Sequence, residues 1–467
     1  MEVKTEQKKA HCLVVPYPLQ GHINPMLQFA KRLEHKGIKV TFVMTNYMLG
    51  KSKQQISTSI SVDTFSDGYD ERDGDLADQL ENYVSRFRDV GSKTLTALVE
   101  KLRLEGVRVD CIVYDAFIPW ILDVAKQLGL IGAAFFTQSC AVDTVYYHVY
   151  EGLLKAPFSE TDPPSSEIVL PGLPPLMPFD MPSFLAPNWP HPYFLNWLTS
   201  QYGNLKQADW VLCNSFYMLE KETIDWLSEF WSVKTIGPTI PSMYLDKQLQ
   251  GDVDYGVSIF KPEIDACLNW LNQKPIGSVV YVSFGSMAIM TNQQMEEMIA
   301  AFRASKFYIM WVVRATEEAK LPENAKQDMS EFVLIVPWCR QLDVLAHKSI
   351  GCFMTHGGWN STLEAISLGV PMVVMPFWSD QPTNAKYVSD VWKIGVRVEI
   401  NGYIGLGGKI VGREEIERCL KEAMEGEKAE DLRRNAVKLK ELAIEAMEEG
   451  GSSDNNIDDF IASFLSS

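Results

Sequence analysis

Short apolar runs that alternate with helix-patterned segments constrain the fold of this chain more than any other feature. A first series of these runs occupies residues 12–17, 39–45, 110–115 and 131–137. A second series occupies residues 278–284, 307–313, 332–336, 350–355 and 371–375. Continuous apolar runs of this length are typical of parallel strands that are buried on both faces. The sequence therefore predicts an α/β chain with two doubly wound parallel sheets.

The length of the chain supports the same division, because 467 residues exceed what a single hydrophobic core usually organises. We predict an N-terminal domain over residues 1–240 and a C-terminal domain over residues 263–450. Residues 241–262 are polar, contain Gly and Pro and lack a clear period, which is typical of a linker. Residues 451–467 are expected to form a helix that packs back on the N-terminal domain. The proline-rich residues 157–192 predict an irregular surface segment.

Composition excludes several classes of partner. The net charge of −17 argues against nucleic acids and anionic membrane surfaces, both of which need Lys and Arg. No apolar run approaches the roughly 18–20 residues that span a bilayer, and the polar N-terminus lacks the apolar region of a signal peptide. The eight cysteines are scattered without a CxxC pair, which favours reduced thiols in a cytoplasmic protein over a disulfide framework or zinc site.

The most informative stretch for function is residues 338–381. Within it, a predicted strand delivers His356, then Gly357 and Gly358, and then a helix start. Helix N-termini offer free N–H groups and a positive dipole end, so phosphate groups bind there. The two glycines allow the backbone to approach a ligand closely.

Polar side chains around this turn extend the predicted binding region. Asn360 and Ser361 add donors at the helix start, and Glu364 follows Asn360 by four residues, on the same helical face. A carboxylate in this position can accept hydrogen bonds from ribose hydroxyls. Ser286 follows another predicted strand and could bind a diphosphate from the facing loop. Together these residues predict a site for a nucleotide sugar.

A second group of residues has the chemistry of a general base. His22 lies in a predicted loop, PLQGHI, before a helix that we expect to begin at Asn24 and Pro25, with Asn24 as its N-cap. Asp115 follows the strand 110–114. Both residues are therefore expected at carboxyl ends of parallel strands, where doubly wound sheets place their sites. A neutral imidazole can deprotonate a hydroxyl group, and a carboxylate on its other nitrogen can fix the tautomer. Spacing alone does not join the two residues.

Residues 338–381 are similar to the signature of the plant family 1 UDP-dependent glycosyltransferases. The resemblance extends along the chain from QGHINP at 20–25 to EGGSSDNNI at 449–457. It implies the GT-B fold, in which two Rossmann-like domains face each other across a cleft. It also implies that the N-terminal domain binds an acceptor and the C-terminal domain binds a UDP-sugar. The sequence departs from the common family pattern at Arg340, where many members have Pro, and at Gly357, where Cys is frequent.

The resemblance also implies roles for individual residues. His22 would be the base and Asp115 its partner. The nucleotide would be held by Trp338 against uracil, by the backbone of Cys339 and by Gln341 and Glu364 at the ribose. The diphosphate would be held by Ser286, His356, Gly358, Asn360 and Ser361. Trp359, Asp380 and Gln381 would contact the sugar, and a glutamine at the last of these positions favours glucose. The acceptor candidates are Gln20, Trp120, Gln138, Tyr146 and Phe377.

The expected enzyme is an inverting transferase of plant secondary metabolism that needs no metal and acts as a monomer. It would move glucose from UDP-glucose to a hydroxyl or a carboxylate of a small lipophilic acceptor, either terpenoid or phenolic. A non-catalytic binding protein on the same scaffold is the alternative, and the presence of both His22 and Asp115 argues against it. An NAD-dependent oxidoreductase is disfavoured because no GxGxxG follows the first strand.

Three other motifs are set aside. The DxD-like pairs Asp73/Asp75 and Asp252/Asp254 lie in acidic, polar stretches that predict solvated loops. The glycine-rich residues 402–408 have no strand-to-helix context and predict a loop or hairpin.

Overall fold

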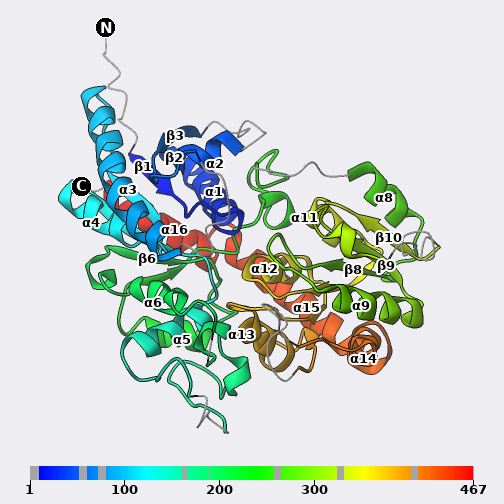
Figure 1. Cartoon of the computed structure of the whole chain (residues 1–467). Helices are drawn as coiled ribbons and strands as arrows, with labels where there is room; N and C mark the ends of the chain where they lie inside the picture. The colour runs from blue at the N-terminus through cyan, green and yellow to red at the C-terminus, as the bar shows by residue number, and fades with distance from the viewer. Residues whose placement is uncertain are drawn as a thin grey trace. The chain divides into compact units, whose positions relative to one another are not determined.

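A computed structural model divides the chain into two compact units (Figure 1). Unit 1 contains Met1–Leu153, His191–Ile259 and Ala446–Ser467, and unit 2 contains Leu154–Pro190 and Phe260–Glu445. The sequence assigned residues 154–190 to the first domain, whereas these residues group with unit 2. The structure describes residues 10–51, 60–71, 80–159, 166–187, 189–256, 264–322, 331–400 and 409–465. Asp73, Asp75 and residues 402–408 lie outside these ranges.

Within the described residues, unit 1 is built on a seven-stranded sheet in which all neighbours pair in parallel. Its spatial order is β3 (Ser61–Phe65), β2 (Lys39–Thr45), β1 (His11–Val15), β4 (Cys111–Asp115), β5 (Ile131–Phe136), β6 (Trp210–Cys213) and β7 (Val233–Thr235). The direction of winding reverses between β1 and β4. Doubly wound sheets bind ligands beyond the carboxyl ends of such a strand pair.

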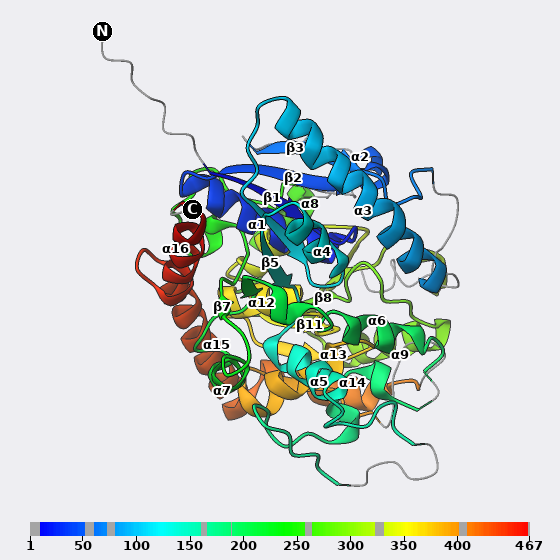
Figure 2. The ribbon, with the colours of Figure 1, turned by 90° about the vertical axis from the view of Figure 1, so that its left-hand side faces the viewer.

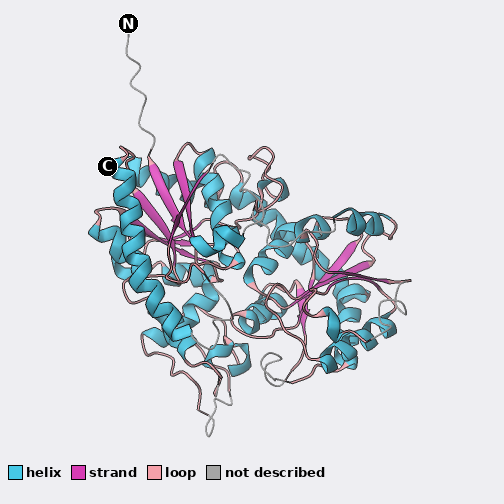
Figure 3. Ribbon diagram, turned by 45° about the horizontal axis from the view of Figure 1, so that its top comes forward, coloured by secondary structure: helices cyan, strands magenta, loops and turns pink. Residues whose placement is uncertain are grey.

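Helices cover both faces of this sheet (Figure 3), which explains why β1 and β4 are buried at every residue. The helices of unit 1 include α1 (Gln20–His35), α2 (Asn46–Lys51), α3 (Leu80–Leu104), α4 (Trp120–Gln127), α5 (Cys140–Tyr150), α6 (Tyr193–Ser200), α7 (Lys221–Leu227) and α16 (Ser452–Leu465).

The last helix, α16, is drawn in red in Figure 2 and packs within unit 1. Its hydroxyl at Ser453 donates to the carbonyl of Gly237 at 2.7 Å. The ring of Phe460 lies 6.0 Å from that of Phe29 in α1 and 5.8 Å from that of Trp210 in β6. The C-terminal segment therefore contributes to the same core as the first helix of the chain.

Unit 2 has a six-stranded sheet among its described residues, again with every pair parallel. Its spatial order is β10 (Val333–Val336), β9 (Tyr308–Val312), β8 (Val279–Ser283), β11 (Ile350–Thr355), β12 (Met372–Val374) and β13 (Gly395–Arg397). Its helices include α8 (Ile264–Asn272), α9 (Asn292–Ser305), α11 (Gln341–Leu345), α12 (Trp359–Leu368), α13 (Gln381–Lys386), α14 (Arg413–Met424) and most of α15 (Gly426–Met447). Winding reverses between β8 and β11, so a second ligand-binding edge is expected there.

The start of α1 differs from the sequence prediction. Asn24 is not the N-cap, because the helix begins at Gln20 and Pro25 lies inside it. The amides of His22 and Ile23 both donate to the carbonyl of Leu19 at 2.9 Å, which closes a helical turn before Pro25 is reached. The fixed φ of proline is compatible with helical backbone, although its missing N–H removes one bond.

Asp252 was predicted to lie in a solvated loop, and this prediction is wrong. Its side chain is buried and lies 2.6 Å from Nζ of Lys31 in α1. It also accepts a hydrogen bond from the amide of Ser242 at 2.7 Å. A buried carboxylate needs such partners, and here they attach the predicted linker to α1.

Candidate active site

His22 lies in the first turn of α1, rather than in a loop, and Asp115 is the last residue of β4. Their side chains meet, with Nδ1 of His22 2.7 Å from Oδ2 of Asp115. Asp115 is completely buried, while the side chain of His22 is 13% exposed. An ionised carboxylate only accepts hydrogen bonds, so Nδ1 of His22 is the donor. Nε2 then carries the lone pair and can accept a proton.

Two backbone amides hold the carboxylate of Asp115 in place. Oδ1 accepts from the amide of Phe117 at 3.0 Å, and Oδ2 accepts from the amide of Tyr17 at 3.3 Å. These bonds fix the orientation of Asp115 independently of His22. The imidazole in turn packs between aromatic rings, 4.7 Å from Phe117 and 5.4 Å from Tyr17 between centroids. Hydrogen bonding and packing together restrict the ring to one orientation.

Thr137 is a second polar neighbour of His22, and the sequence reasoning missed it. Its Oγ1 lies 3.1 Å from Nδ1 of His22. Thr137 immediately follows β5, the strand beside β4, so its position at a carboxyl strand end was the signal that could have found it.

In unit 2, β11 leads through His356 and two glycines into α12, as the sequence predicted. Gly357 has φ +82°, and a Cβ there would lie 2.6 Å from Cγ1 of Val374. A Cβ at Gly358 would lie 2.6 Å from Nε2 of His356. A side chain at either position would have to displace Val374 or His356, so both positions favour glycine, and the turn leads directly into the N-terminus of α12.

Four residues form a connected polar cluster beside this turn. Nε2 of Gln341 donates to Oγ of Ser361 at 3.0 Å and to Oε2 of Glu364 at 2.6 Å. The hydroxyl of Tyr281 donates to Oε1 of Gln341 at 3.2 Å. The structure thus joins α11 to α12 through the residues that the resemblance assigned to the ribose and the diphosphate. Tyr281, on β8, was not predicted from the sequence.

His356 is held as a neutral imidazole. Burial lowers its pKa to about 4, because the charged form is poorly solvated there. The hydroxyl of Thr355 lies 3.2 Å from its Nδ1. A neutral imidazole has one N–H, which can donate to a phosphate oxygen without adding a positive charge.

Ser286 is exposed on the loop that follows β8, the strand beside β11. Arg314, which follows β9, donates from its guanidinium to the backbone carbonyls of Ser286 and Ala288. The rigid fork of the guanidinium matches two acceptors at once. Arg314 therefore fixes the loop that presents Ser286, and sequence reasoning missed it.

Of the three sugar-binding candidates, Trp359 begins α12, whereas Asp380 and Gln381 lie at the start of α13. Asp380 is buried, and its Oδ2 accepts from Nδ2 of Asn384 at 2.8 Å. The same amide group of Asn384 donates to the carbonyl of Gly357 at 2.8 Å, which links α13 to the glycine turn. Oε1 of Gln381 accepts from the amides of residues 377–378 at 2.8 and 3.1 Å. These two bonds fix the orientation of the side-chain amide of Gln381.

The remaining donor candidates vary in exposure. Trp338 and Asn360 are partly buried, whereas Cys339 and Trp359 are buried. A hydrogen bond with Cys267 and burial raise the pKa of the Cys339 thiol well above its usual range, so the thiol stays neutral.

Comparison with known proteins gives a consistent result. Residues 218–442 match the family described as UDP-glucoronosyl and UDP-glucosyl transferase. UDP-glycosyltransferase 74E2 of Arabidopsis thaliana is 47% identical over 97% of this chain and 99% of its own length. Mogroside I-E synthase of Siraitia grosvenorii is 44% identical over 98% of this chain and 99% of its own. The chain belongs to the plant family 1 UDP-dependent glycosyltransferases.

The fold of this glycosyltransferase is GT-B, because it matches solved structures of that class. The crystal structure of Os79 from O. sativa in complex with UDP has a TM-score of 0.89 and 40% identity, and the match covers 97% of this chain and 100% of that chain. The predicted fold is therefore confirmed, as is the prediction that the chain is an enzyme. A UDP-sugar is the donor substrate of this glycosyltransferase.

The acceptor candidates of this glycosyltransferase fall into two groups. Gln20 is partly exposed in the first turn of α1, and Trp120 and Gln138 retain 8% exposure. Tyr146 has no exposed surface and Phe377 has 1%. Both side chains therefore pack in the core of their units, and their assignment as acceptor residues stays a prediction.

Two properties of the described residues bear on metal binding and membrane insertion. No group of three or more His, Cys, Asp or Glu side chains that could hold a metal ion occurs among them. None of their helices is long and apolar enough to cross a membrane.

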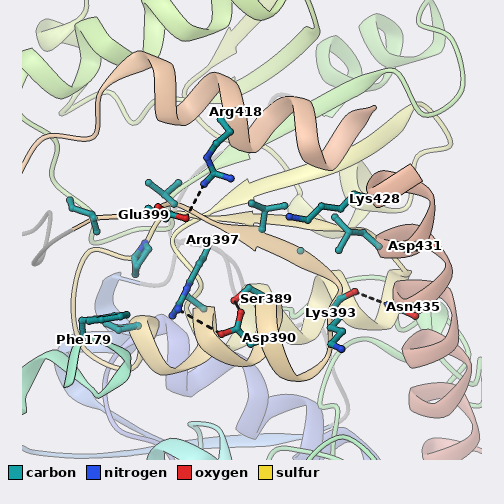
Figure 4. Close-up of a pocket in the computed structure, with 18 residues that line it drawn as sticks. Phe179, Ser389, Asp390, Lys393, Arg397, Glu399, Arg418, Lys428, Asp431 and Asn435 are labelled. Atoms are coloured by element: carbon teal, nitrogen blue, oxygen red, sulfur yellow. Dashed lines mark hydrogen bonds and ion pairs between the residues drawn. The ribbon is translucent and has the colours of Figure 1, made fainter. Parts of the chain in front are cut away.

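A cavity of about 810 Å³ in unit 2 is separate from the donor candidates (Figure 4). It is lined by Phe179, by Arg397 on β13, by Arg418 on α14 and by Asp431 on α15, among others. Most of its charged groups are already paired, as Arg418 is with Glu415 and Arg397 is with Asp390. None of the residues that the sequence assigned to the donor lines it.

The buried carboxyl of Asp380 predicts a pH-dependent effect on stability. Burial raises its pKa to about 6, so the folded state prefers the protonated form and the stability that this form provides is lost as the pH rises through 6. We expect Asp380→Asn, which cannot ionise, to stabilise unit 2 by as much as about 3 kcal/mol at pH 8. The difference from the wild type should shrink as the pH falls and vanish by about pH 4.

Urea unfolding at several pH values measures this difference. The amide oxygen of the substituted side chain can still accept from Asn384, so the fold should be retained. A variant that is less stable than the wild type at pH 8, but not at pH 4, would contradict the raised pKa of Asp380.

Proposed function

We propose that this chain is an inverting glucosyltransferase that acts on a hydroxyl or a carboxylate of a small lipophilic acceptor, terpenoid or phenolic, with UDP-glucose as donor. The observation that carries the proposal is the 2.7 Å contact between His22 and the buried Asp115. The acceptor class draws on relatives named mogroside I-E synthase and flavonol 7-O-beta-glucosyltransferase, and on a structure of Os79 in complex with a trichothecene.

The proposed reaction starts at Nε2 of His22. This nitrogen takes the proton of an acceptor hydroxyl while the acceptor oxygen attacks the anomeric carbon of the glucose. The bond between that carbon and the phosphate oxygen breaks, and UDP leaves with both electrons. Attack from the side opposite the leaving group converts the α-linked donor into a β-glucoside. Asp115 stabilises the imidazolium that forms.

The residues of unit 2 are proposed to hold UDP-glucose in three parts. Trp338 stacks on the uracil, the backbone of Cys339 binds its edge, and the joined side chains of Gln341 and Glu364 bind the ribose. The diphosphate is bound by Ser286, His356, Gly358, Asn360 and Ser361. The N-terminus of α12 and these donors stabilise the negative charge of the leaving UDP. Trp359, Asp380 and Gln381 bind the hydroxyls of the glucose.

A mass-spectrometric screen tests the proposal. The purified enzyme is incubated with UDP-glucose, UDP-galactose or UDP-glucuronate and a panel of terpenoid and phenolic alcohols and acids. We expect products that carry one hexose, formed fastest with UDP-glucose, with the β configuration established by NMR. Faster transfer from UDP-glucuronate would contradict the assignment of the donor, and an α-linked product would contradict inversion.

The two acceptor chemistries should depend differently on His22. A carboxylic acid, with a pKa of about 4, is already ionised at neutral pH and needs no base, whereas a hydroxyl group does. We expect His22→Ala to lower kcat on both kinds of acceptor. The fold loss on a carboxylate should be at least about ten times smaller than the fold loss on a hydroxyl. The measurement compares initial rates on one acid and one alcohol that the wild type converts. Equal losses on both would contradict a role of His22 as the base.

A further inference from the structure

The segment Met177–Leu185 is hydrogen-bonded to the loop that carries the sugar-binding candidates. The amide of Ser183 donates to the carbonyl of Ser379 at 2.9 Å, and the amide of Ser379 donates to Oγ of Ser183 at 2.7 Å. On the other side, Oγ1 of Thr383 donates to the carbonyl of Asp180 at 2.7 Å. These three bonds hold the backbone immediately before and shortly after Asp380 and Gln381.

Asp180 fixes the segment itself. Its carboxylate is completely buried and accepts from the amide of Met177 at 2.8 Å. It forms an ion pair with the guanidinium of Arg397 on β13, and Nζ of Lys386 on α13 lies 3.9 Å away. Arg397 is also drawn toward Asp390 in Figure 4. A buried carboxylate with these partners cannot leave its place without leaving charges unpaired. The segment is therefore a fixed support for α13.

The conformation of Ser379 needs such a support. Its φ of +62° lies in the left-handed region, which residues other than glycine rarely adopt unless their surroundings enforce it. Both backbone polar groups of Ser379 are bonded to Ser183. The rings of Phe184 and Trp378 are in contact at 6.0 Å, which packs the preceding residue of the loop. A rotation that released Ser379 would move Asp380, the next residue.

We propose that Ser183 is a positioning residue for the donor sugar, because it fixes the backbone from which Asp380 and Gln381 project. The proposal rests on the sugar contacts proposed above for these two residues. Ser183 is completely buried and acts through Ser379 rather than by touching the donor. The candidates for the uracil, the ribose and the diphosphate come from other parts of unit 2. We therefore expect Ser183 to act chiefly on the sugar half of the donor, although the bond from Asn384 to Gly357 links α13 to the turn that carries the diphosphate candidates.

Ser183→Ala tests this inference. We expect Kd for UDP-glucose, measured by calorimetry, and KM for UDP-glucose to rise about three- to tenfold, as the loss of one hydrogen bond predicts. Kd for UDP and KM for the acceptor should not change. The matched control is Ser166→Ala, an exposed serine in the Leu154–Pro190 part of unit 2 but outside Met177–Leu185. It should leave all four constants unchanged.

A second variant removes the other support without changing side-chain shape. Thr383→Val deletes the hydroxyl that donates to Asp180 and should raise Kd for UDP-glucose in the same way. If Ser183→Ala does not fold, Thr383→Val still tests whether the segment Met177–Leu185 positions the backbone around Asp380 and Gln381. Equal losses of affinity for UDP and UDP-glucose in these variants would overturn the inference, because they would indicate a general structural role.

The variants Asp380→Ala and Gln381→Ala separate the inference from the proposed function. If they weaken UDP-glucose binding while Ser183→Ala and Thr383→Val do not, the positioning role is overturned and the sugar contacts stand. If Asp380→Ala and Gln381→Ala leave the affinity for UDP-glucose unchanged, the proposed sugar contacts fail, and the role of Ser183 fails with them.

Discussion

Replacing His22 with Ala is expected to lower kcat on hydroxyl acceptors by about 10²- to 10⁴-fold, the range that a positioned general base contributes. Without the imidazole, no group accepts the acceptor proton as the oxygen attacks. Kd for UDP-glucose should stay at its wild-type value, because the donor candidates all belong to unit 2 and His22 belongs to unit 1. Single-turnover kinetics and calorimetry with UDP-glucose measure the two quantities separately.

His35 provides a matched control for this variant. It lies at the last turn of the same helix, α1, and is exposed. His35→Ala should leave both kcat and Kd unchanged. Turnover of alcohols by His22→Ala at close to the wild-type rate would remove His22 from the reaction. A parallel loss of UDP-glucose binding would point to a folding defect instead.

The sequence predicted the strands that are long and uniformly apolar. Residues 39–45 and 350–355 form β2 and β11 with the same bounds as predicted. Continuous apolar runs followed by helical spacing have few alternative structures, so both sheets were expected. The turn at residues 357–358 and the start of α12 were predicted because two glycines between a strand and a helix allow the backbone to approach a ligand, and the structure adds a positive φ at Gly357.

Four strands were not predicted, and their composition explains why. β7 and β13 contain three residues each, and β6 contains four, which is too short for a period to be visible. β3, with the sequence SVDTF, carries polar side chains among its apolar ones. These strands form because a neighbouring strand offers unpaired backbone N–H and C=O groups. The position of that neighbour follows from the tertiary fold, so the local sequence does not reveal it.

The candidate site also has parts that the sequence could predict and parts that it could not. The placement of His22 and Asp115 at strand ends follows from local pattern, and the reversal of winding between β1 and β4 brings those ends together. Contacts such as Arg314 on the Ser286 loop, or Asp180 with Arg397 on β13, each involve at least one irregular segment that carries no period. No local pattern in the chain could have predicted them.

Asp115→Asn is expected to lower kcat on hydroxyl acceptors by about 10²- to 10⁴-fold, although the side chain keeps its shape. The amide oxygen of an asparagine there can still accept from the amide of Phe117 in place of Oδ1, whereas the NH₂ group takes the place of Oδ2 and the bond from the amide of Tyr17 is lost. Its NH₂ group then faces Nδ1 of His22, which must become an acceptor. The imidazole proton moves to Nε2, and His22 can no longer take a proton from the acceptor. The control is Asp89→Asn, an exposed carboxylate on α3, which should leave kcat unchanged.

A double variant shows whether Asp115 acts through His22. If its only role is to set the tautomer and charge of the imidazole, adding Asp115→Asn to His22→Ala should cause no further loss of kcat. Independent roles would instead give losses that multiply. The second outcome would contradict the proposed pair, because Asp115 would then contribute to kcat by a route that does not pass through His22. The coupling between the two substitutions therefore tests the 2.7 Å contact more directly than either substitution does alone.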